Sequence, residues 1–145
     1  MRVLLVDDDP DIRLLVRSVL TRAGLQADAA PDARSGLKML NARRPAFDLV
    51  VLDVQMPEMD GWDTLEAIRT NPATADIRVI LCTVKSSPED MAHAWRLGCD
   101  GYITKPFELR DLASEALSVG FRAEADRLNA RAVGLTRANE ALNAA

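Results

Sequence analysis

"DLVVLDVQMPEMDGWD", residues 48–63, starts as a hydrophobic run and ends as a turn. Four apolar residues lead directly to Asp53, and Pro57 and the pair Asp60-Gly61 follow as turn signals. A short run that is apolar at every position is typical of a parallel strand covered on both faces. The stretch therefore predicts a buried strand that carries the carboxylate of Asp53 at its end.

Runs of the same kind recur along the chain. The starts of the runs are separated by about 25 residues, the length of one strand and one helix. Helical stripes fill the intervals, and five strand–helix units account for residues 1 to 119. The sequence therefore predicts an α/β fold, a doubly wound parallel sheet with right-handed crossovers and helices on both faces. The predicted strands are residues 3–6, 26–30, 49–52, 77–82 and 101–103.

Polar side chains follow four of these strands. Asp7 and Asp8 follow the first, Asp53 the third, Thr83 the fourth and Lys105 the fifth. The carboxyl ends of parallel strands share one edge of the sheet, where ligands of such folds bind. Carboxylates are suitable ligands for Mg²⁺, an aspartate can act as a nucleophile, and a hydroxyl and an ammonium can hold phosphoryl oxygens. This set predicts metal-assisted phosphoryl transfer to an aspartate.

Four segments carry a resemblance to a known family. "VLLVDDDP", "DLVVLDVQMPEMDG", "VILCTVKS" and "DGYITKPF" are similar, in order and spacing, to segments of bacterial two-component response-regulator receiver domains. The resemblance covers residues 1–119 and implies the flavodoxin-like strand order 2-1-3-4-5. It also implies a phosphoacceptor rather than a turnover enzyme, with a histidine kinase or phosphotransfer protein as the donor.

The resemblance assigns the acidic residues to phosphorylation and metal binding. Asp53 is the residue that would become a 4-aspartylphosphate. Asp8 would bind Mg²⁺, or Mn²⁺ as an alternative ion, directly, and Asp7 would act mainly through water. The backbone carbonyl of Gln55 would be a third ligand from the protein.

The resemblance also implies a switch. Lys105 would bind the phosphoryl group, Thr83 would be the switch hydroxyl and Tyr102 the switch aromatic residue. Their movement would change the face formed by the fourth helix, the fifth strand and the fifth helix. The Lys105-Pro106 bond resembles the family's cis peptide.

Three alternatives remain from the residues alone. A receiver can serve as a phosphorylation-independent scaffold. A haloacid-dehalogenase-type phosphatase also uses a strand-end aspartate, but it needs a second aspartate where this chain has Gln55. A flavin-binding protein would need a phosphate loop, and carboxylates at this edge would repel the flavin phosphate. Asp9 is interpreted as a helix cap, and His93 as a surface or partner-facing residue.

Composition limits the function classes further. The 145 residues carry a net charge of −4, which argues against nucleic acid as a partner of this chain alone. We expect no membrane association, because no apolar run approaches transmembrane length. The acidic N-terminus differs from a signal peptide. Cys82 and Cys99 lack metal-ligand spacing, so we expect reduced thiols in a cytoplasmic protein.

Residues 120–145 form a separate helical extension in this interpretation. Its heptad pattern predicts a short coiled coil and thereby a homodimer, for which the face of the fourth helix, fifth strand and fifth helix is a second candidate surface. A polar helix packed on its own domain is the alternative. The seam residues are Phe121, Ala125, Leu128, Ala132, Leu135, Asn139 and Leu142.

Overall fold

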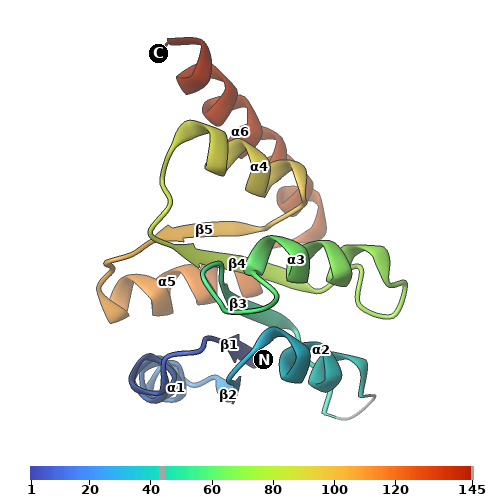
Figure 1. Ribbon diagram of the computed structural model, residues 1–145, viewed down its shortest axis with the longest axis vertical. Coiled ribbons are helices and arrows are strands. Elements are labelled where there is room, and N and C mark those ends of the chain that lie inside the picture. The colour runs from blue at the N-terminus through green and yellow to red at the C-terminus, as the bar shows by residue number, and fades with distance from the viewer. Residues whose placement is uncertain (43–44, 145) are drawn as a thin grey trace.

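The computed structural model describes residues 1–42 and 45–144, and contains a five-stranded parallel sheet with helices on both faces (Figure 1). The strand order β2-β1-β3-β4-β5 is the predicted one. The strands are β1 (Arg2–Val6), β2 (Gln26–Ala30), β3 (Leu49–Asp53), β4 (Arg78–Thr83) and β5 (Gly101–Thr104). The helices are α1 (Pro10–Arg22), α2 (Ala33–Asn41), α3 (Gly61–Thr70), α4 (Pro88–Arg96), α5 (Leu109–Gly120) and α6 (Glu124–Ala144).

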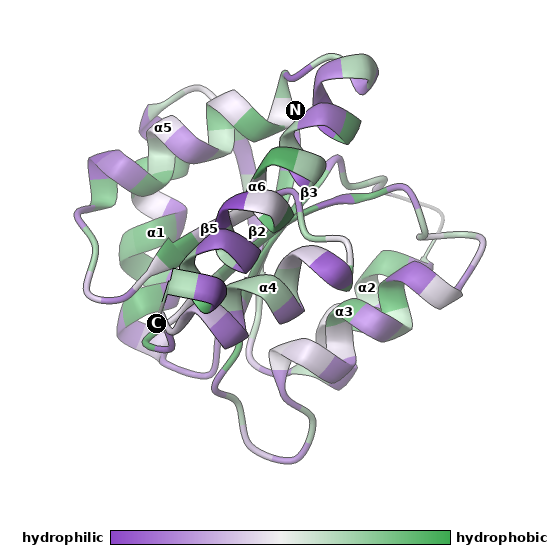
Figure 2. Cartoon of the chain, turned by 90° about the horizontal axis from the view of Figure 1, so that it is seen from above, coloured by the Kyte–Doolittle hydropathy of each residue, from purple (hydrophilic) through white to green (hydrophobic). Residues whose placement is uncertain are grey.

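The continuous apolar run of β3 serves two hydrophobic cores. Leu49 and Val51 point into the core beneath α1 and α5, whereas Val50 and Leu52 point into the core beneath α2, α3 and α4. Figure 2 shows α1 and α5 on one side of the sheet and α2 and α3 on the other. Because successive side chains of a strand face opposite sides, a strand covered on both faces has no polar alternation.

Strands β3, β4 and β5 each end one residue later than predicted, whereas β1 and β2 end at the predicted residues. Asp53 is the last residue of β3 and lies opposite Cys82 of β4, and Thr83 is the last residue of β4. Both side chains are thus fixed by strand backbone rather than by a loop. This places the two polar groups on neighbouring strands at the same edge of the sheet.

Side-chain caps begin the helices on either side of that edge. The Asp9 carboxylate accepts hydrogen bonds from the backbone N–H groups of Asp11 and Ile12, so its predicted role as a cap is confirmed. Ser87 caps α4 by accepting from the backbone N–H of Asp90. These caps fix where α1 and α4 begin relative to the strand ends.

The helical extension packs on its own domain. Helix α6 runs along α4 (Figure 1). Ala138 of α6 is buried. The predicted seam lies mostly outside this contact, because Phe121 and Leu128 are 69% and 64% exposed, whereas Leu135 and Leu142 are partly buried. Pairing of α6 with a second copy therefore stays a prediction. Ala145 lies outside the described residues.

Asp100 holds α6 to the rest of the domain through ion pairs. Its carboxylate forms ion pairs with Arg69 of α3 at 3.0 Å, Arg127 of α6 at 2.6 Å and Arg131 of α6 at 3.1 Å. It also accepts the backbone N–H of Val79 at 3.0 Å. Burial raises the pKa of Asp100, but the Arg127 and Val79 hydrogen bonds and the arginine charges outweigh burial and hold the pKa below its usual value.

We expect Asp100→Asn to lower the free energy of unfolding by about 3–5 kcal/mol at pH 7, because three arginines lose a buried counter-charge. Since the folded-state pKa is depressed, the carboxylate's contribution is present above the unfolded pKa and is lost as pH falls through the folded value. Urea unfolding monitored by circular dichroism at pH 7 and below pH 4 measures both effects, and the difference between the two proteins should shrink in acid.

Glu108→Gln is the matched control, since it removes the charge of an exposed pair with Arg110. Exposed pairs contribute little to stability, so its unfolding midpoint should stay close to that of the wild type. Equal midpoints for Asp100→Asn and Glu108→Gln would contradict the anchoring role of Asp100.

Candidate functional site

Three carboxylates meet at the carboxyl end of the sheet. Asp7 and Asp8 follow β1, and Asp53 ends the adjacent β3. One carboxylate oxygen from each lies within 4.8 Å of the others. Asp7 and Asp53 are only 2% and 3% exposed, whereas Asp8 is exposed. The site therefore has two buried acids and one that opens to solvent.

Lys105 supplies the positive charge of this cluster. Its Nζ lies 3.3 Å from an oxygen of Asp7 and 3.3 Å from an oxygen of Asp53. The Lys105-Pro106 peptide bond is cis, as the sequence resemblance implied. A single ammonium is therefore shared between two buried carboxylates, which offsets part of their mutual repulsion.

The pKa of Asp53 reflects this balance of burial and charge. Burial and the negative charge of Asp7 raise the Asp53 pKa to about 6, although Lys105 and the Gln55 backbone N–H act in the opposite direction. Burial lowers the pKa of Lys105, but the charges of Asp7 and Asp53 outweigh it and raise the Lys105 pKa above its usual value. Lys105 therefore stays protonated, and the cluster still has an uncompensated negative charge.

Gly61 lets the loop after β3 close tightly behind Asp53. A Cβ atom at position 61 would lie 2.6 Å from the backbone carbonyl oxygen of Asp53 and 2.6 Å from the Cα of Val54. The Gly61 N–H also donates to the Val54 carbonyl at 2.9 Å. The Asp60-Gly61 turn signal thus marks a close backbone approach that only glycine permits.

Gln55 connects Asp53 to the buried hydroxyl of Thr83. The Gln55 backbone N–H donates to Asp53 Oδ1 at 3.2 Å, while its side-chain Nε2 lies 2.8 Å from Thr83 Oγ1. Thr83 is fully buried. Asp53 at the end of β3 and Thr83 at the end of β4 are therefore linked through Gln55, whose carboxamide is hydrogen-bonded to the Thr83 hydroxyl.

Lys85 is held at both of its backbone polar groups. Its N–H donates to Thr83 Oγ1 at 2.9 Å, and its carbonyl accepts a hydrogen bond from the hydroxyl of Tyr102 on β5. Burial raises the pKa of Tyr102, so the phenol stays protonated and remains a donor. The loop that leads to α4 is therefore fixed by two of the residues that the sequence predicted as switch residues.

The donor atoms fit a hard divalent cation. Carboxylate oxygens at this separation are the ligands that Mg²⁺ prefers, and the exposure of Asp8 leaves room for waters. The residual negative charge of the cluster also favours a cation. Asp7, Asp8 and Asp53 are thus brought together as predicted, and the ligand role of the Gln55 carbonyl stays a prediction.

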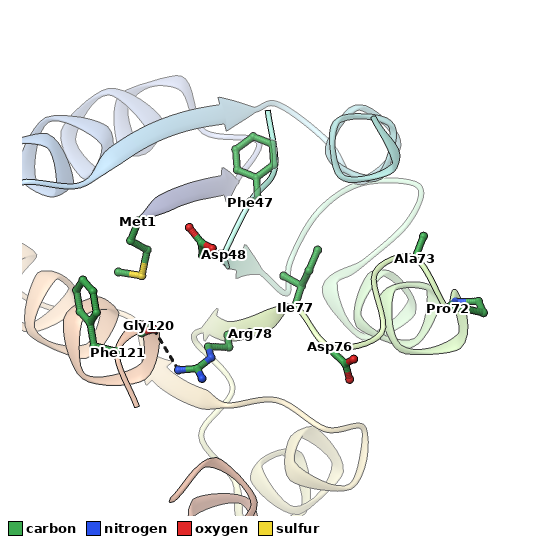
Figure 3. Close-up of a pocket in the computed structure, with 10 residues that line it drawn as sticks. All are labelled: Met1, Phe47, Asp48, Pro72, Ala73, Asp76, Ile77, Arg78, Gly120 and Phe121. Carbon is green, nitrogen blue, oxygen red and sulfur yellow. Dashed lines mark hydrogen bonds between the residues drawn. The ribbon is translucent and has the colours of Figure 1, made fainter. Parts of the chain in front are cut away.

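The opposite edge of the sheet has a hollow of about 600 Å³ without this chemistry (Figure 3). Arg78 lines it and donates to the carbonyl oxygens of Val119 and Gly120, while Asp48 accepts the backbone N–H of Arg2. Arg78 and Asp48 are therefore already paired with backbone, and Asp76 is the third charged residue that lines the hollow. His93 is exposed, as predicted, and its ring packs edge-on against Trp62 with centroids 4.9 Å apart.

Sequence reasoning missed two features near the site. The side-chain bond between Gln55 and Thr83 was missed, because the 28 residues that separate them carry no pairing signal. The hydrogen bonds at Lys85 were missed as well, since backbone groups of a loop have no signature in the residue types. The close approach at Gly61 has a signal, the Asp-Gly pair, but that pair predicted only a turn.

Comparison with known proteins identifies the family to which most of the chain is similar. The family model of the response regulator receiver domain matches residues 3–117. The transcriptional regulatory protein RprY of Bacteroides fragilis is 37% identical over 112 residues, which cover 77% of this chain and 46% of RprY. An uncharacterized 14.6 kDa protein of Leptolyngbya boryana is 38% identical over 77% of this chain and 84% of its own length. The chain spans about half the length of several regulators it matches.

Solved structures agree with this result. The chemotaxis protein CheY4 of Vibrio cholerae superimposes with a TM-score of 0.74 and 32% identity, over 81% of this chain and 97% of CheY4. The BeF3-activated receiver domain of DrrB gives a TM-score of 0.71 and 30% identity, over 83% of this chain and 97% of that domain. Both likenesses leave part of this chain uncovered.

In metal-free buffer, we expect Asp53→Asn to be more stable than the wild type above pH 6, by about 1–3 kcal/mol. The raised Asp53 pKa means that the folded protein binds this proton more tightly than the unfolded chain does. The wild type is therefore penalised above about pH 6, and the penalty disappears as pH falls towards the unfolded pKa. Urea unfolding from pH 4 to pH 8 in EDTA measures the difference.

Asp28→Asn provides the control, because this acid lies in a separate, half-exposed pair with Arg2. It should not gain stability above pH 6. An Asp53→Asn protein that is less stable than the wild type at pH 7.5 without metal would show that electrostatic strain at the carboxylate cluster is absent.

Proposed function

This chain belongs to the response regulator receiver family, and from that membership and its carboxylate cluster we propose that Asp53 accepts a phosphoryl group. The single observation that carries the proposal is the convergence of Asp7, Asp8 and Asp53 around one ammonium, that of Lys105. Such a cluster provides a nucleophile, cation ligands and a fixed positive charge within one site. The protein is accordingly a phosphoacceptor rather than a turnover enzyme.

In this mechanism an Asp53 carboxylate oxygen attacks the phosphorus atom of the donor. The new oxygen–phosphorus bond forms as the bond from phosphorus to the donor's leaving group breaks, and the leaving group takes the bonding electron pair. The Lys105 ammonium stays beside the carboxylate that gains the phosphoryl group and offsets charge on its oxygens. Thr83 provides a hydroxyl donor from the neighbouring strand once the hydrogen bond that it donates to Gln55 Oε1 is exchanged.

Asp8, Asp53 and the Gln55 backbone carbonyl would hold Mg²⁺ or Mn²⁺, with Asp7 acting through water. A bound divalent cation would neutralise charge on the transferred phosphoryl oxygens. The role of Asp7 differs from that of Asp8 because Asp7 is buried and paired with Lys105, whereas Asp8 is open to solvent.

An apolar patch beside the site supports a protein as the phosphoryl donor. Leu15 of α1 is 49% exposed, and Val84, directly after Thr83, is 61% exposed. Both line a shallow depression next to Lys105, together with Phe107. A patch of this kind fits a partner protein better than it fits a small phosphate ester. We propose a histidine kinase or phosphotransfer protein as this partner, and the cytoplasm as the location.

Gln55 argues against the alternative of a haloacid-dehalogenase-type phosphatase. The position two residues after the nucleophile would need a general acid, and here it carries a carboxamide bonded to Thr83. A phosphorylation-independent scaffold would have no need for Asp7 and Asp53 to be buried together against their mutual repulsion. DNA binding is not proposed for this chain alone, and no helix of the described residues is long and apolar enough to span a membrane.

We expect incubation with acetyl phosphate and Mg²⁺ to add the mass of one phosphoryl group to the intact protein. Asp53→Asn should gain none, and EDTA should abolish the gain in the wild type. Asp9→Asn is a matched control, because Asp9 caps α1 and lies outside the carboxylate cluster, so this variant should be phosphorylated normally. Equal mass gain by the wild type and by Asp53→Asn would contradict the proposal.

We also propose that two copies of α6 pair through the heptad seam. Leu128 is 64% exposed in the single chain, so its replacement by lysine leaves the packing on α4 intact and disrupts only a seam. Light scattering should give the mass of a dimer for the wild type and of a monomer for Leu128→Lys, while Asn129→Lys, a change at another exposed position of α6, should remain dimeric. A monomeric wild type, with and without acetyl phosphate, would refute pairing.

A further inference from the structure

Helix α6 packs on α4, and the loop that leads into α4 is hydrogen-bonded to residues at the edge of the carboxylate site. The route begins at Lys85, whose N–H is held by Thr83 and whose carbonyl is held by Tyr102. Two residues later Ser87 caps α4, and α4 carries α6 along its outer side (Figure 1). The position of α6 therefore depends on a helix whose entrance is set by two hydrogen bonds at the edge of the site.

Both of these bonds require the resting positions of Thr83 and Tyr102. Resting on the proposed function, a phosphoryl group on Asp53 would draw the Thr83 hydroxyl away from Gln55 and from the Lys85 N–H. If Tyr102 then occupies the space that Thr83 leaves, its hydroxyl leaves the Lys85 carbonyl as well. The loop before α4 would lose both anchors in one step.

Helices α4 and α6 are packed too closely at Trp95 for α4 to move while their contact stays unchanged. Gly134 of α6 lies against the indole of Trp95 of α4, where an added Cβ would be only 2.4 Å from Cε2. Ala138, one turn further, is 4% exposed. Close packing of small residues against a rigid ring tolerates little displacement before contact is lost. A shift of α4 would therefore break its contact with the C-terminal half of α6.

The N-terminal half of α6 is held by ion pairs that involve neither Trp95 nor the loop after Thr83. Arg127 and Arg131 both pair with Asp100, which precedes β5 and is fixed by the Val79 N–H of β4. Asp100 lies in the turn between α4 and β5, and its hydrogen bond to β4 does not involve the loop after Thr83. The first turns of α6 should thus remain attached while the part that faces Trp95 separates.

We propose that α6 is a phosphorylation-sensitive cover of α4, pivoting on the Asp100 ion pairs and released from Trp95 when Asp53 is phosphorylated. The resting chain buries the Trp95 side of α4 under residues 134–142. The phosphorylated chain exposes this side of α4 and the inner side of α6 at the same time. Helix α6 is then the element of this chain that reports the state of Asp53.

Gly134→Ala separates docking from helix formation. The added methyl group conflicts with Trp95, whereas alanine is a better helix former than glycine, so the helix should persist while its contact with α4 weakens. Thr136→Ala is the matched control, because it also raises helix propensity but lies at an exposed position. Amide hydrogen exchange of residues 134–142 should be at least tenfold faster in Gly134→Ala than in Thr136→Ala, with equal helical circular dichroism.

The same measurement tests the link to phosphorylation. Acetyl phosphate and Mg²⁺ should accelerate exchange of residues 134–142 in the wild type at least tenfold, and leave residues 124–131 nearly unchanged. Asp53→Asn should not respond. By reciprocity, Gly134→Ala should bind beryllofluoride severalfold more tightly than Thr136→Ala, because its α6 is already released.

The outcomes separate the two proposals. A protein that gains phosphoryl mass on Asp53 but keeps its slow exchange in residues 134–142 overturns the cover and leaves the proposed function standing. A protein that gains no phosphoryl mass overturns the proposed function, and the coupling to α6 falls with it. Slow exchange in Gly134→Ala, equal to that in Thr136→Ala, overturns the packing of α6 against Trp95 as the point of release.

Discussion

The shared ammonium of Lys105, 3.3 Å from both Asp7 and Asp53, is the interaction on which the site depends. Two carboxylates buried on adjacent strands repel each other, and burial alone raises the cost of ionising either one. Lys105 reduces that cost but leaves the Asp53 pKa at about 6. The carboxylates therefore repel one another in the resting chain, and a bound divalent cation would reduce this repulsion.

Much of the fold could be predicted, because each strand serves two cores. Leu49 and Val51 face one core and Val50 and Leu52 the other, so the run that contains them has no polar alternation and is easily recognised. The strand order followed from the resemblance and is confirmed. Once the strands are known, the convergence of Asp7, Asp8 and Asp53 follows from their position at the strand ends.

The features that were not predicted are those in which a residue lies in an environment, or has a role, that is unusual for its type. Arg127 lies in a polar helix and would be expected in solvent, yet it is 4% exposed because Asp100 receives it. A glycine within a helix usually weakens it, but the missing side chain of Gly134 admits the ring of Trp95. Gln55 was predicted to act through its backbone carbonyl, and its side chain is also hydrogen-bonded to Thr83. Each case depends on a partner distant in sequence, which periodicity and propensity do not encode.

Two separate sets of contacts hold α6 and the start of α4 in place. Ion pairs to Asp100 hold the start of α6 to the strands, and these contacts do not involve the loop after Thr83. Hydrogen bonds at Lys85 hold the entrance of α4, and both come from residues at the edge of the carboxylate site. On the proposed function, a charge added at Asp53 would therefore act on α4 through the two bonds at Lys85, while the Asp100 ion pairs stay in place. Because a ligand shifts only an equilibrium between states that it distinguishes, the two exchangeable bonds at Lys85 are the physical difference on which such a shift would depend.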